Sequence, residues 1–493
     1  MTSEEYYASK LQRLPDHDMR MVSRPSIDFA NVKRVHLVGV CGTAMGSLAG
    51  LLREAGYEVT GSDAGCYPPM DRLIAELGIT FFEGYDPSHL EGADVIVVGN
   101  ASGPDNPEAA YARARGLPTL SLPEAVAEFF IKNKRSLVVA GTHGKTTTSG
   151  LLTHVFVSAG KDPTYLVGGV PQGIGKGYHV GTGEHFIIEG DEYDTAYFDK
   201  RPKFLHYRPT SAIVTSVEFD HVDIYDDLDD YRHAFRFLAE IVPENGTLFI
   251  WGDSEETRGL AERSNAKTYG LMPGNDITAK DVTVSPTGQR FTLVIDGNEL
   301  GEVETLQFGA HNLNNVLSVC AVALSEGLTF EQVQHGIASF AGMKRRQEVF
   351  AEEKGVTFVD DFAHHPTAVR ETLKAMNMRY PDRRIIALFE PRSNTSRRKL
   401  FEQGYIESFD AADALYLKVP PMRHNDSPED FMDAEKVVRE ITARGTEAHL
   451  CDTTDELVSS LVPVLKEGDV VLVMSNGSFD NIYTKLPEAW RAS

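Results

Sequence analysis

The sequence predicts an α/β fold in three domains: a Rossmann-like N-terminal domain, a central P-loop ATPase-like domain with appended β-hairpins, and a Rossmann-like C-terminal domain. Two observations support this prediction. The chain has 493 residues, and at about 100–200 residues per domain we expect roughly three hydrophobic cores. A pattern of apolar strand, turn and amphipathic helix also starts afresh three times, near residues 34, 136 and 343.

The first series defines a domain over residues 33–132. RVHLVGV, YEVTGSD and ADVIVVGNA have the apolar runs of buried strands, and the segments between them, CGTAMGSLAGLLREAG and MDRLIAELG, are typical of helices, as is the later PEAAYARARG. This alternation predicts a doubly wound parallel sheet. Residues 1–32 have no clean period, so we treat them as an N-terminal extension without an assigned role.

The second series defines a central domain over residues 133–342, with strands expected in SLVVAG, HFIIEGDEYD, SAIVTSVEFDH and GTLFIWGD. Residues 276–308 instead alternate between polar and apolar around the turn signals PTG and DGN, which predicts antiparallel hairpins. The third series, over residues 343–493, has strands in VTFVDD, RRIIALFE, DALYLKV and DVVLVMSN, with helices between them.

Composition excludes several classes of protein. The net charge of −24 disfavours binding to nucleic acid or to anionic membranes. The chain begins without an apolar signal segment, and no apolar run approaches the ~18 residues of a membrane span. Four scattered cysteines, without CxxC spacing, are expected to be reduced: Cys41, Cys66, Cys320 and Cys451. We therefore expect a cytoplasmic protein, and nothing points to an obligate protein partner.

Residues 140–148, AGTHGKTTT, join an apolar strand to an amphipathic helix and predict a phosphate-binding loop. Glycines let backbone N–H groups turn toward phosphate oxygens, the helix N-terminus adds a favourable dipole, Lys145 adds charge, and a threonine hydroxyl can reach Mg²⁺. The strict Walker pattern needs glycine where this chain has Val139, so the loop is a shortened variant. The alternative, a plain glycine turn, does not explain the Lys-Thr pair.

A second glycine-rich turn follows the first strand of the N-terminal domain. Gly39, Gly42 and Gly46 are followed by Asp63 at the end of the next strand. This arrangement resembles a dinucleotide fingerprint, but its GxxGxxxG spacing departs from GxGxxG, and helix packing alone would also explain the glycines. A nucleotide diphosphate is a better candidate ligand than a nicotinamide dinucleotide.

Acidic and histidine side chains follow two predicted strands of the central domain, within EGDEYD (189–194) and EFDHVD (218–223). Carboxylates and imidazole beside a P-loop suit a Mg²⁺–ATP site, although solvated acidic loops are the alternative. Four further segments lie where a ligand would be expected or at the domain junction. Helix capping alone would explain GAHNLNN (309–315), and a solvated charge run would explain the cations 344–346. DDFAHHPT and EPRSNT follow predicted strands, where ligands bind in open α/β sheets.

Six ordered motifs, GTHGKTTT, DEYD, EFDHVD, GAHNLNN, GMKRRQE and DDFAHHPTA, resemble the Mur ligase superfamily from about residue 33 onward. GTHGKTTT and DDFAHHPTA look most like the branch that acts on UDP-N-acetylmuramate itself. Within that branch CYPPM, GNAS, FDKRPKFLHY, EPRSNT and VMSNGSF are similar to the enzymes that add a ready-made murein peptide, whereas the L-alanine-adding enzymes differ at EPRSNT.

The resemblance implies a reaction and its cofactors, ATP and Mg²⁺. UDP-N-acetylmuramate would be joined to L-alanyl-γ-D-glutamyl-meso-diaminopimelate through an acyl phosphate, with release of ADP and phosphate, in the recycling of peptidoglycan. Residues 33–132 would bind the UDP sugar, 133–342 ATP, and 343–493 nucleotide and the incoming peptide. Because all three domains contribute, we expect them to close over the substrates.

The resemblance also implies roles for individual residues. Lys145, Glu192 and His221 would be catalytic, and the metal ligands would be Thr146, Glu192 and His221. The ATP site would comprise Thr142, His143, Gly144, Lys145, Thr146, Thr147, Asn312, Asn315, Arg346 and Asp361. The UDP sugar would contact Gly39, Gly42, Thr43 and Asp63, and the peptide His365, Arg392, Ser393 and Asn394.

Three alternatives remain open at this point. The L-alanine-adding ligase uses the same chemistry with a smaller nucleophile. A nucleotide-binding regulator would keep the fold without catalysis, although Lys145, Glu192 and His221 are all present. A nicotinamide oxidoreductase would use the first glycine turn but leaves the second loop unexplained.

Overall fold

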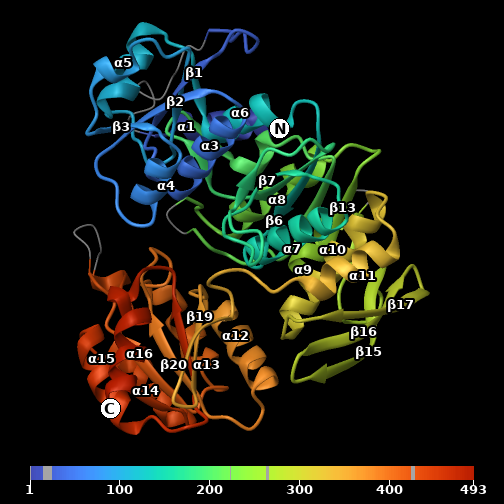
Figure 1. Cartoon of the computed structure of the whole chain (residues 1–493), viewed down its shortest axis with the longest axis vertical. Coiled ribbons are helices and arrows are strands. Elements are labelled where there is room, and N and C mark those ends of the chain that lie inside the picture. Colours follow the sequence, from blue (N-terminus) through green and yellow to red (C-terminus); the bar gives the residue numbers. More distant parts are fainter. Residues whose placement is uncertain (1, 15–24, 222–223, 262–265, 423–427) are drawn as a thin grey trace.

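The computed structural model describes residues 2–14, 25–221, 224–261, 266–422 and 428–493. Three sheet-centred α/β domains follow one another along the chain, coloured blue, green to yellow, and orange to red in Figure 1. This confirms the predicted fold class. Among the described residues, no helix has the length and apolar character needed to cross a membrane.

The N-terminal domain is built on a five-stranded parallel sheet with the order β3-β2-β1-β4-β5. Its apolar strands are buried, as expected for a parallel sheet with both faces covered. The elements are β1 (Arg34–Val38), α3 (Thr43–Glu54), β2 (Glu58–Asp63), α4 (Met70–Glu76), β3 (Thr80–Glu83), η1 (Pro87–Leu90), β4 (Val95–Val98), α5 (Pro107–Arg115), β5 (Thr119–Ser121), α6 (Leu122–Val126) and η2 (Ala127–Ile131).

The central domain has a ten-stranded sheet with the order β17-β16-β15-β14-β13-β12-β6-β9-β7-β8. Six strands are neighbours in a parallel core, and β15–β17 form the predicted antiparallel hairpins at its edge. The strands are β6 (Arg135–Ala140), β7 (Thr164–Leu166), β8 (Tyr178–His179), β9 (His185–Gly190), β12 (Ser211–Val214), β13 (Thr247–Trp251), β14 (Ala266–Tyr269), β15 (Ile277–Ser285), β16 (Gly288–Ile295) and β17 (Asn298–Thr305).

Helices of the central domain cover both faces of this sheet. They are α7 (Lys145–Ser158), η3 (Lys203–His206), α8 (Leu228–Ile241), α9 (Glu255–Ala261), α10 (Ala310–Ser325) and α11 (Phe330–Ser339). One apolar cluster packs α7, α10 and α11 on one face, and a second lies on the other face under α8. The second cluster continues without a break into the N-terminal domain, where it includes Val35 and Leu37.

A small hairpin of the central domain, β10 (Asp194–Ala196) and β11 (Asp199–Pro202), reaches into the N-terminal domain. Its tip residues, Tyr197 and Phe198, are buried against Val38, Val98 and other side chains of the first sheet and α5. Nearby, Gly50 of α3 lies so close to the Tyr178 ring that a Cβ atom would come within 2.2 Å of it. These contacts join the first two domains through apolar surface.

The C-terminal domain has a six-stranded sheet with the order β18-β19-β23-β20-β21-β22. All neighbours are parallel except the first pair. The elements are β18 (Glu348–Glu353), β19 (Val356–Asp361), α12 (Pro366–Arg379), β20 (Ile385–Glu390), η4 (Lys399–Phe401), α13 (Glu402–Ser408), β21 (Ala414–Lys418), η5 (Pro428–Asp430), α14 (Ala434–Arg444), β22 (Glu447–Cys451), α15 (Thr454–Leu461), η6 (Val462–Val464), β23 (Val470–Ser475), η7 (Phe479–Asn481) and α16 (Ile482–Ala492).

The N-terminal extension contains a helix that the sequence pattern did not predict, α1 (Ser3–Gln12). A capping box between Thr2 and Glu5 starts this helix. The helix packs on β11 of the central domain rather than on the N-terminal domain that follows it in sequence. Tyr7 is the single buried residue of α1. The helix therefore lacks the repeated apolar positions from which a sequence pattern predicts a helix.

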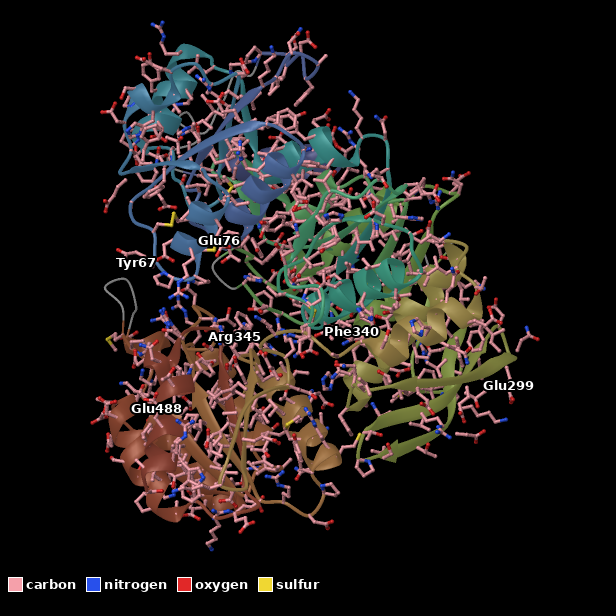
Figure 2. The ribbon with its side chains drawn as sticks, in the orientation of Figure 1. Tyr67, Glu76, Glu299, Phe340, Arg345 and Glu488 are labelled. Carbon is pink, nitrogen blue, oxygen red and sulfur yellow. A yellow bond between two sulfur atoms is a disulfide. The ribbon has the colours of Figure 1, made fainter. Side chains whose placement is uncertain are left out.

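The expectation of four reduced cysteines was wrong for one pair. Cys41 and Cys66 form a disulfide, visible as a yellow bond in Figure 2, whereas Cys320 and Cys451 are free and buried. The pair is separated by 25 residues in sequence. Cys41 lies in the turn after β1 and Cys66 in the turn after β2, and neighbouring parallel strands bring these turns together at one edge of the sheet.

Candidate active site

The predicted phosphate-binding loop joins β6 to α7. Gly141 and Gly144 have φ angles of 131° and 81°, which side-chain-bearing residues rarely adopt, and a Cβ atom at Gly144 would lie 2.9 Å from the Asn315 amide oxygen. Gly144 is the N-cap of α7, and Lys145 is the first residue of that helix. The loop therefore packs closely against α10. It leads directly into the N-terminus of α7, and a glycine-rich loop at a helix N-terminus is the arrangement that binds phosphate.

Lys145 lies at the centre of a buried cluster of charged groups. Its Nζ atom donates to the Gly141 carbonyl at 2.6 Å and to Glu192 Oε2 at 2.7 Å. Glu192 is fully buried, and its other oxygen lies 3.3 Å from His221 Nε2. The three residues predicted to be catalytic are thus brought together from α7, the segment after β9 and the segment after β12.

The electrostatics of this cluster favour charged side chains. Burial by itself would raise the pKa of Glu192, but Lys145 and His221 outweigh it and lower that pKa to about 2. Burial would lower the pKa of His221, but Glu192 and Asp220 raise it to about 9. A cation that takes His221 as a ligand must therefore displace its proton.

The residues present fit a bound divalent cation. Thr146 donates its hydroxyl to Glu189 Oε1 at 2.9 Å, beside the cluster of Lys145, Glu192 and His221. Hydroxyl and carboxylate oxygens are preferred ligands of Mg²⁺, and burial holds them without competing solvent. The sequence placed Glu189 in the acidic cluster but did not single it out, although its contact with Thr146 puts it at the same site.

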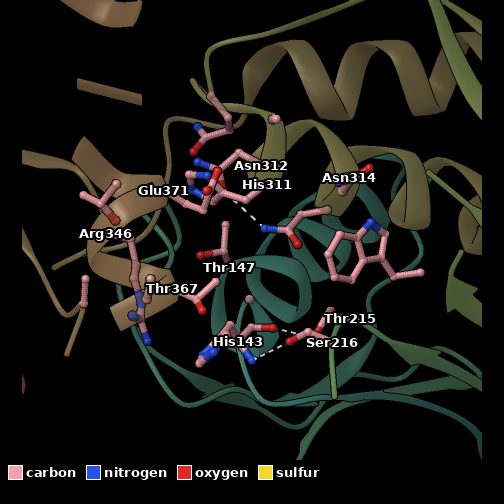
Figure 3. A pocket seen from close by; sticks show the side chains of 18 of the residues that line it. His143, Thr147, Thr215, Ser216, His311, Asn312, Asn314, Arg346, Thr367 and Glu371 are labelled. Carbon is pink, nitrogen blue, oxygen red and sulfur yellow. Dashed lines mark hydrogen bonds between the residues drawn. The ribbon is translucent and has the colours of Figure 1, made fainter. Parts of the chain in front are cut away.

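A cavity of about 510 Å³ opens beside the loop. It is lined by α7, α10, the linker into the C-terminal domain, and α12, and Figure 3 shows their side chains around one space. Eight of the ten predicted ATP-site residues line it: His143, Gly144, Thr146, Thr147, Asn312, Asn315, Arg346 and Asp361. The other two are not among the lining residues: Thr142 bonds Tyr231 at 2.8 Å, and Lys145 bonds Glu192.

The cavity also has an apolar part to its lining. Trp251, Leu271 and Met272 line it, and so do His311 and Asn312. Burial lowers the pKa of His311 to about 4, so its imidazole is neutral at pH 7. Such a surface suits a purine ring. Trp251 was not predicted, although its place at the end of strand β13 is a position where ligands bind in open α/β sheets.

The C-terminal domain closes this cavity through polar contacts. Thr367 donates to Glu218 Oε2 at 2.6 Å, and Thr395 donates to Asp220 Oδ1 at 2.7 Å. Burial would raise the pKa of Glu218, but His143 and Thr367 lower it to about 2. Both acidic residues lie in EFDHVD, whose last residue, Asp223, lies outside the described part of the chain. These interdomain hydrogen bonds were not predicted.

The two arginines of the linker at residues 344–347 contact different domains. Arg345 bonds within the C-terminal domain, to Asp360 at 3.0 Å and to the Ser475 carbonyl at 2.9 Å, and Figure 2 shows it at the edge facing the central domain. Arg346 points the other way, with Nη2 3.4 Å from Thr146 Oγ1. The prediction that a linker cation approaches the phosphate loop thus fits Arg346.

Asp361, predicted to contact the ribose, holds the backbone of the same linker. It accepts hydrogen bonds from the Gln347 N–H at 2.9 Å and the Ala363 N–H at 2.7 Å. Burial raises the pKa of its carboxyl above the usual range. Asp361 therefore shapes the cavity wall as well as lining it.

The predicted UDP-sugar residues cluster in the N-terminal domain and are not among those lining the cavity. Gly39 has a φ of 84°, and Gly42 and Thr43 begin α3. Asp63 accepts the Cys41 N–H at 2.9 Å and the Ala64 N–H at 2.8 Å. Its carboxylate thus fixes the glycine-rich turn beside it.

The predicted peptide residues lie in two places. Arg392, Ser393 and Asn394 belong to the loop after β20, which reaches the His221 segment through Thr395. His365 instead caps α12 and packs on His143, with ring centroids 4.5 Å apart. Burial and the neighbouring His143 lower the pKa of His365 to about 3, so it is a neutral group at pH 7.

The fold and the site define a class of protein: a three-domain α/β protein in which a cavity beside a P-loop-type turn is closed by the C-terminal domain. Three family models match the chain in order, the Mur ligase family catalytic domain (residues 34–134), the Mur ligase middle domain (139–323) and the Mur ligase, glutamate ligase domain (345–477). The chain therefore belongs to the Mur ligase family.

Individual relatives agree with this assignment. The UDP-N-acetylmuramate–L-alanyl-γ-D-glutamyl-meso-2,6-diaminoheptandioate ligase of Escherichia coli K12 is 38% identical over 459 residues, which span 92% of this chain and 97% of the relative. A UDP-N-acetylmuramate–L-alanine ligase of Desulfitobacterium hafniense is 33% identical, over 90% and 97%. A crystal structure of a murein peptide ligase from Psychrobacter arcticus is 32% identical with a TM-score of 0.69, over 94% and 99%.

Proposed function

We propose that this chain is an ATP-dependent ligase that joins L-alanyl-γ-D-glutamyl-meso-diaminopimelate to the lactyl carboxylate of UDP-N-acetylmuramate, in the recycling of peptidoglycan. The choice of substrate is supported chiefly by the 38% identity to the Escherichia coli ligase of that name, across 97% of its length. The choice of chemistry is supported by the cluster of Lys145, Glu192 and His221 beside the phosphate loop.

A carboxylate is a poor acyl donor, so it must first be activated. Transfer of the ATP γ-phosphoryl group to the lactyl carboxylate forms an acyl phosphate and ADP. The free amine of the tripeptide then attacks the carbonyl carbon, the C–O bond to phosphate breaks, and the amine proton leaves with the phosphate product. Lys145, Arg346 and the loop amides would neutralise the charge of the β- and γ-phosphates, which is the main contribution proteins make to phosphoryl transfer.

Thr146, Glu192 and His221 would hold Mg²⁺, and Glu189 is a further candidate ligand because it bonds Thr146. When bound, Mg²⁺ supplies Lewis-acid stabilisation of charge on the transferring phosphoryl group. The protein's own part is to keep these ligands buried and to exclude water, since water would hydrolyse an acyl phosphate.

The three domains would divide the substrates. Residues 33–132 would hold the UDP sugar through Gly39, Gly42, Thr43 and Asp63. Residues 133–342 would hold ATP. Residues 343–493 would contribute Arg346 and Asp361 to the nucleotide, and Arg392, Ser393 and Asn394 to the carboxylates of the peptide. The proposed location is the cytoplasm, because ATP and UDP sugars are found there.

The decisive experiment measures phosphate release from ATP with UDP-N-acetylmuramate present, comparing tripeptide with L-alanine and checking the product by mass. The proposal expects release and ligation with tripeptide. Turnover with L-alanine alone would assign the chain to the biosynthetic reaction, an alternative kept open by the 33% identity to an L-alanine ligase. ATP binding without release in either case would favour a non-catalytic regulator.

A matched pair of variants tests the site itself. Lys145→Ala removes the buried ammonium group and is expected to lower kcat by about 10²–10³-fold, in the range seen when a key electrostatic group is lost. UDP-N-acetylmuramate binding should persist, because its proposed site lies in another domain. Lys280→Ala, which removes an exposed hairpin lysine paired only with Glu299 among the described contacts, is the control and should leave kcat unchanged. Loss of UDP-sugar binding in folded Lys145→Ala would contradict the division between domains.

A further inference from the structure

The N-terminal helix α1 contacts the central domain beside the proposed metal ligands. Tyr6 stacks on His233 with ring centroids 5.5 Å apart, and Tyr7 packs edge-on against Phe237 at 6.0 Å. His233 and Phe237 both belong to α8. Helix α1 thus packs an aromatic pair on the helix that follows the His221 segment, near the junction of the first two domains (Figure 1).

The polar contact of α1 is with a buried carboxylate. Asp230, in the first turn of α8, pairs with Lys10 Nζ and accepts a hydrogen bond from the Tyr6 hydroxyl. The side chain of Asp230 is 7% exposed and that of Lys10 is 19% exposed. A carboxylate at this depth needs a charged partner. Among the described ion pairs Lys10 is that partner, so the first turn of α8 depends on a residue more than 200 positions earlier.

Asp230 in turn holds the segment that carries His221. It accepts the N–H of Asp226 at 3.2 Å. The residues just before, Ile224 and Tyr225, donate their N–H groups to the His221 carbonyl at 2.8 and 3.1 Å. His221 itself has a φ of 53°, a left-handed conformation that a side-chain-bearing residue keeps only when its surroundings enforce it.

Tyr225 links α1 to the second proposed metal ligand. Lys10 Nζ lies 5.5 Å from the centroid of the Tyr225 ring, close enough for a cation–π contact. The Tyr225 hydroxyl donates to the backbone carbonyl of Glu192, and the ring is buried. Lys10 therefore contacts two residues. One is Asp230, whose carboxylate bonds the turn after His221, and the other is Tyr225, whose hydroxyl bonds the backbone of Glu192.

We propose that α1 is a positioning element for the catalytic centre, in which Lys10, through Asp230 and Tyr225, fixes the backbone at His221 and Glu192. The proposal rests on the proposed roles of His221 and Glu192 in the ligase reaction. It assigns a function to residues that lie before the stretch matched by the family models, which begins at residue 34. Lys10 touches none of the reacting groups, so it is a positioning residue.

The rival explanation is that α1 only adds apolar burial and stability. The two explanations differ in what Lys10→Met does. A purely stabilising helix predicts a lower melting temperature and unchanged local protection in the native state. A positioning helix predicts faster local opening around His221 while the rest of the central domain stays protected, because opening of one segment and global unfolding are separate events.

The first arm of the test measures amide hydrogen exchange in the full-length protein without ligands. In Lys10→Met, the amides of Ile224, Tyr225 and Asp226 should exchange about tenfold faster, since Asp230 loses its charged partner. Lys10→Arg keeps the charge and should restore slow exchange. Glu4→Gln is the matched control on the same helix, because Glu4 is 81% exposed and its ion pair with Arg201 is long, at 3.8 Å.

The second arm measures turnover with the substrates of the proposed reaction. Lys10→Met should lower kcat about tenfold and raise the Mg²⁺ concentration for half-maximal rate, with the KM for UDP-N-acetylmuramate unchanged and with rescue by Lys10→Arg. Wild-type exchange at the three amides in Lys10→Met would overturn the proposal. If the wild-type protein has no ligase activity, the proposed function fails, while the exchange arm still decides whether Lys10 positions the segment.

Discussion

The two domain junctions of this protein are held together by different kinds of contact. The N-terminal and central domains share one continuous apolar cluster, and Tyr197 and Phe198 are inserted from one into the other. Apart from Met343, which directly precedes the linker, the described residues of the C-terminal domain share no apolar cluster with the central domain. They meet instead through hydrogen bonds such as Thr367–Glu218 and Thr395–Asp220.

This difference indicates which junction can open. Separating apolar surfaces exposes them to water at a cost proportional to area, so the first two domains should behave as one body. Hydrogen bonds at a junction are replaced by bonds to water when it opens, so their net contribution is about 1 kcal/mol each. The cavity beside the phosphate loop lies at the polar junction, where opening and closing would admit and release the nucleotide proposed to bind there.

The largest expected effect is on the apolar junction. Phe198→Ala removes a buried ring and should lower the free energy of unfolding by about 3–4 kcal/mol. In calorimetry the wild-type protein should show two transitions, one for the first two domains together and one for the C-terminal domain. In Phe198→Ala the first transition should separate into two, one for the N-terminal domain and one for the central domain.

Leu400→Ala is the control for this experiment, because it removes an apolar side chain that is 66% exposed in the C-terminal domain. Its calorimetric trace should match that of the wild type. If the N-terminal domain melted independently in the wild-type protein, the apolar junction would not join the first two domains into one cooperative unit.

A smaller effect on stability and a clear effect on activity are expected at the polar junction. Thr395→Val removes the hydroxyl that bonds the buried carboxylate of Asp220 and should lower the free energy of unfolding by about 2 kcal/mol. Closure should be impaired, so kcat/KM for the peptide should fall about tenfold. Thr442→Val, whose hydroxyl bonds only its own helix among the described contacts, should leave both quantities unchanged.

The smallest expected effect is the pH dependence of closure. Glu218 has a pKa of about 2 in the closed structure, below its ordinary value of 4.5. A lowered pKa means that the carboxylate stabilises the closed state fully above pH 4.5, and that this contribution is lost as the pH falls toward 2. Since the side chain is 32% exposed, we expect about 1 kcal/mol.

Small-angle scattering measures this effect as a change in the radius of gyration. Between about pH 5 and pH 3 the wild-type protein should expand as its C-terminal domain separates, and Glu218→Gln should show a flatter profile over the same range. Equal profiles for the two proteins would mean that Glu218 does not couple pH to closure.

Much of the fold was predictable because its signals are local. The strand β6, the loop and Lys145 are consecutive in sequence, and the shortened glycine pattern identified them without a structure. The hairpins β15–β17 were predicted from alternation and two turns. The helix α1 was missed because it buries one residue and depends on a partner, Asp230, that is 220 residues away from Lys10.

The sequence motifs predicted several residues that the structure brings together at the candidate site, but they did not predict the contacts between these residues. Sequence motifs placed Glu192, His221 and Lys145 in one site, and the structure brings them within hydrogen-bonding distance. Motifs carried no signal that Glu189 bonds Thr146 or that Asp63 fixes a turn. Such contacts join the end of one strand to a helix or a turn elsewhere in the chain, and the local sequence pattern does not show which elements become neighbours.

The sequence by itself determined the order of the domains, the phosphate loop and the chemical types available at the site, because strand and helix periodicity and glycine turns depend on neighbouring residues. Only the tertiary structure decided that Cys41 meets Cys66, that one junction is apolar and the other mainly polar, and that Lys10 pairs with Asp230. These pairings arise from packing between elements distant in sequence, and packing depends on the shape and burial of the folded chain.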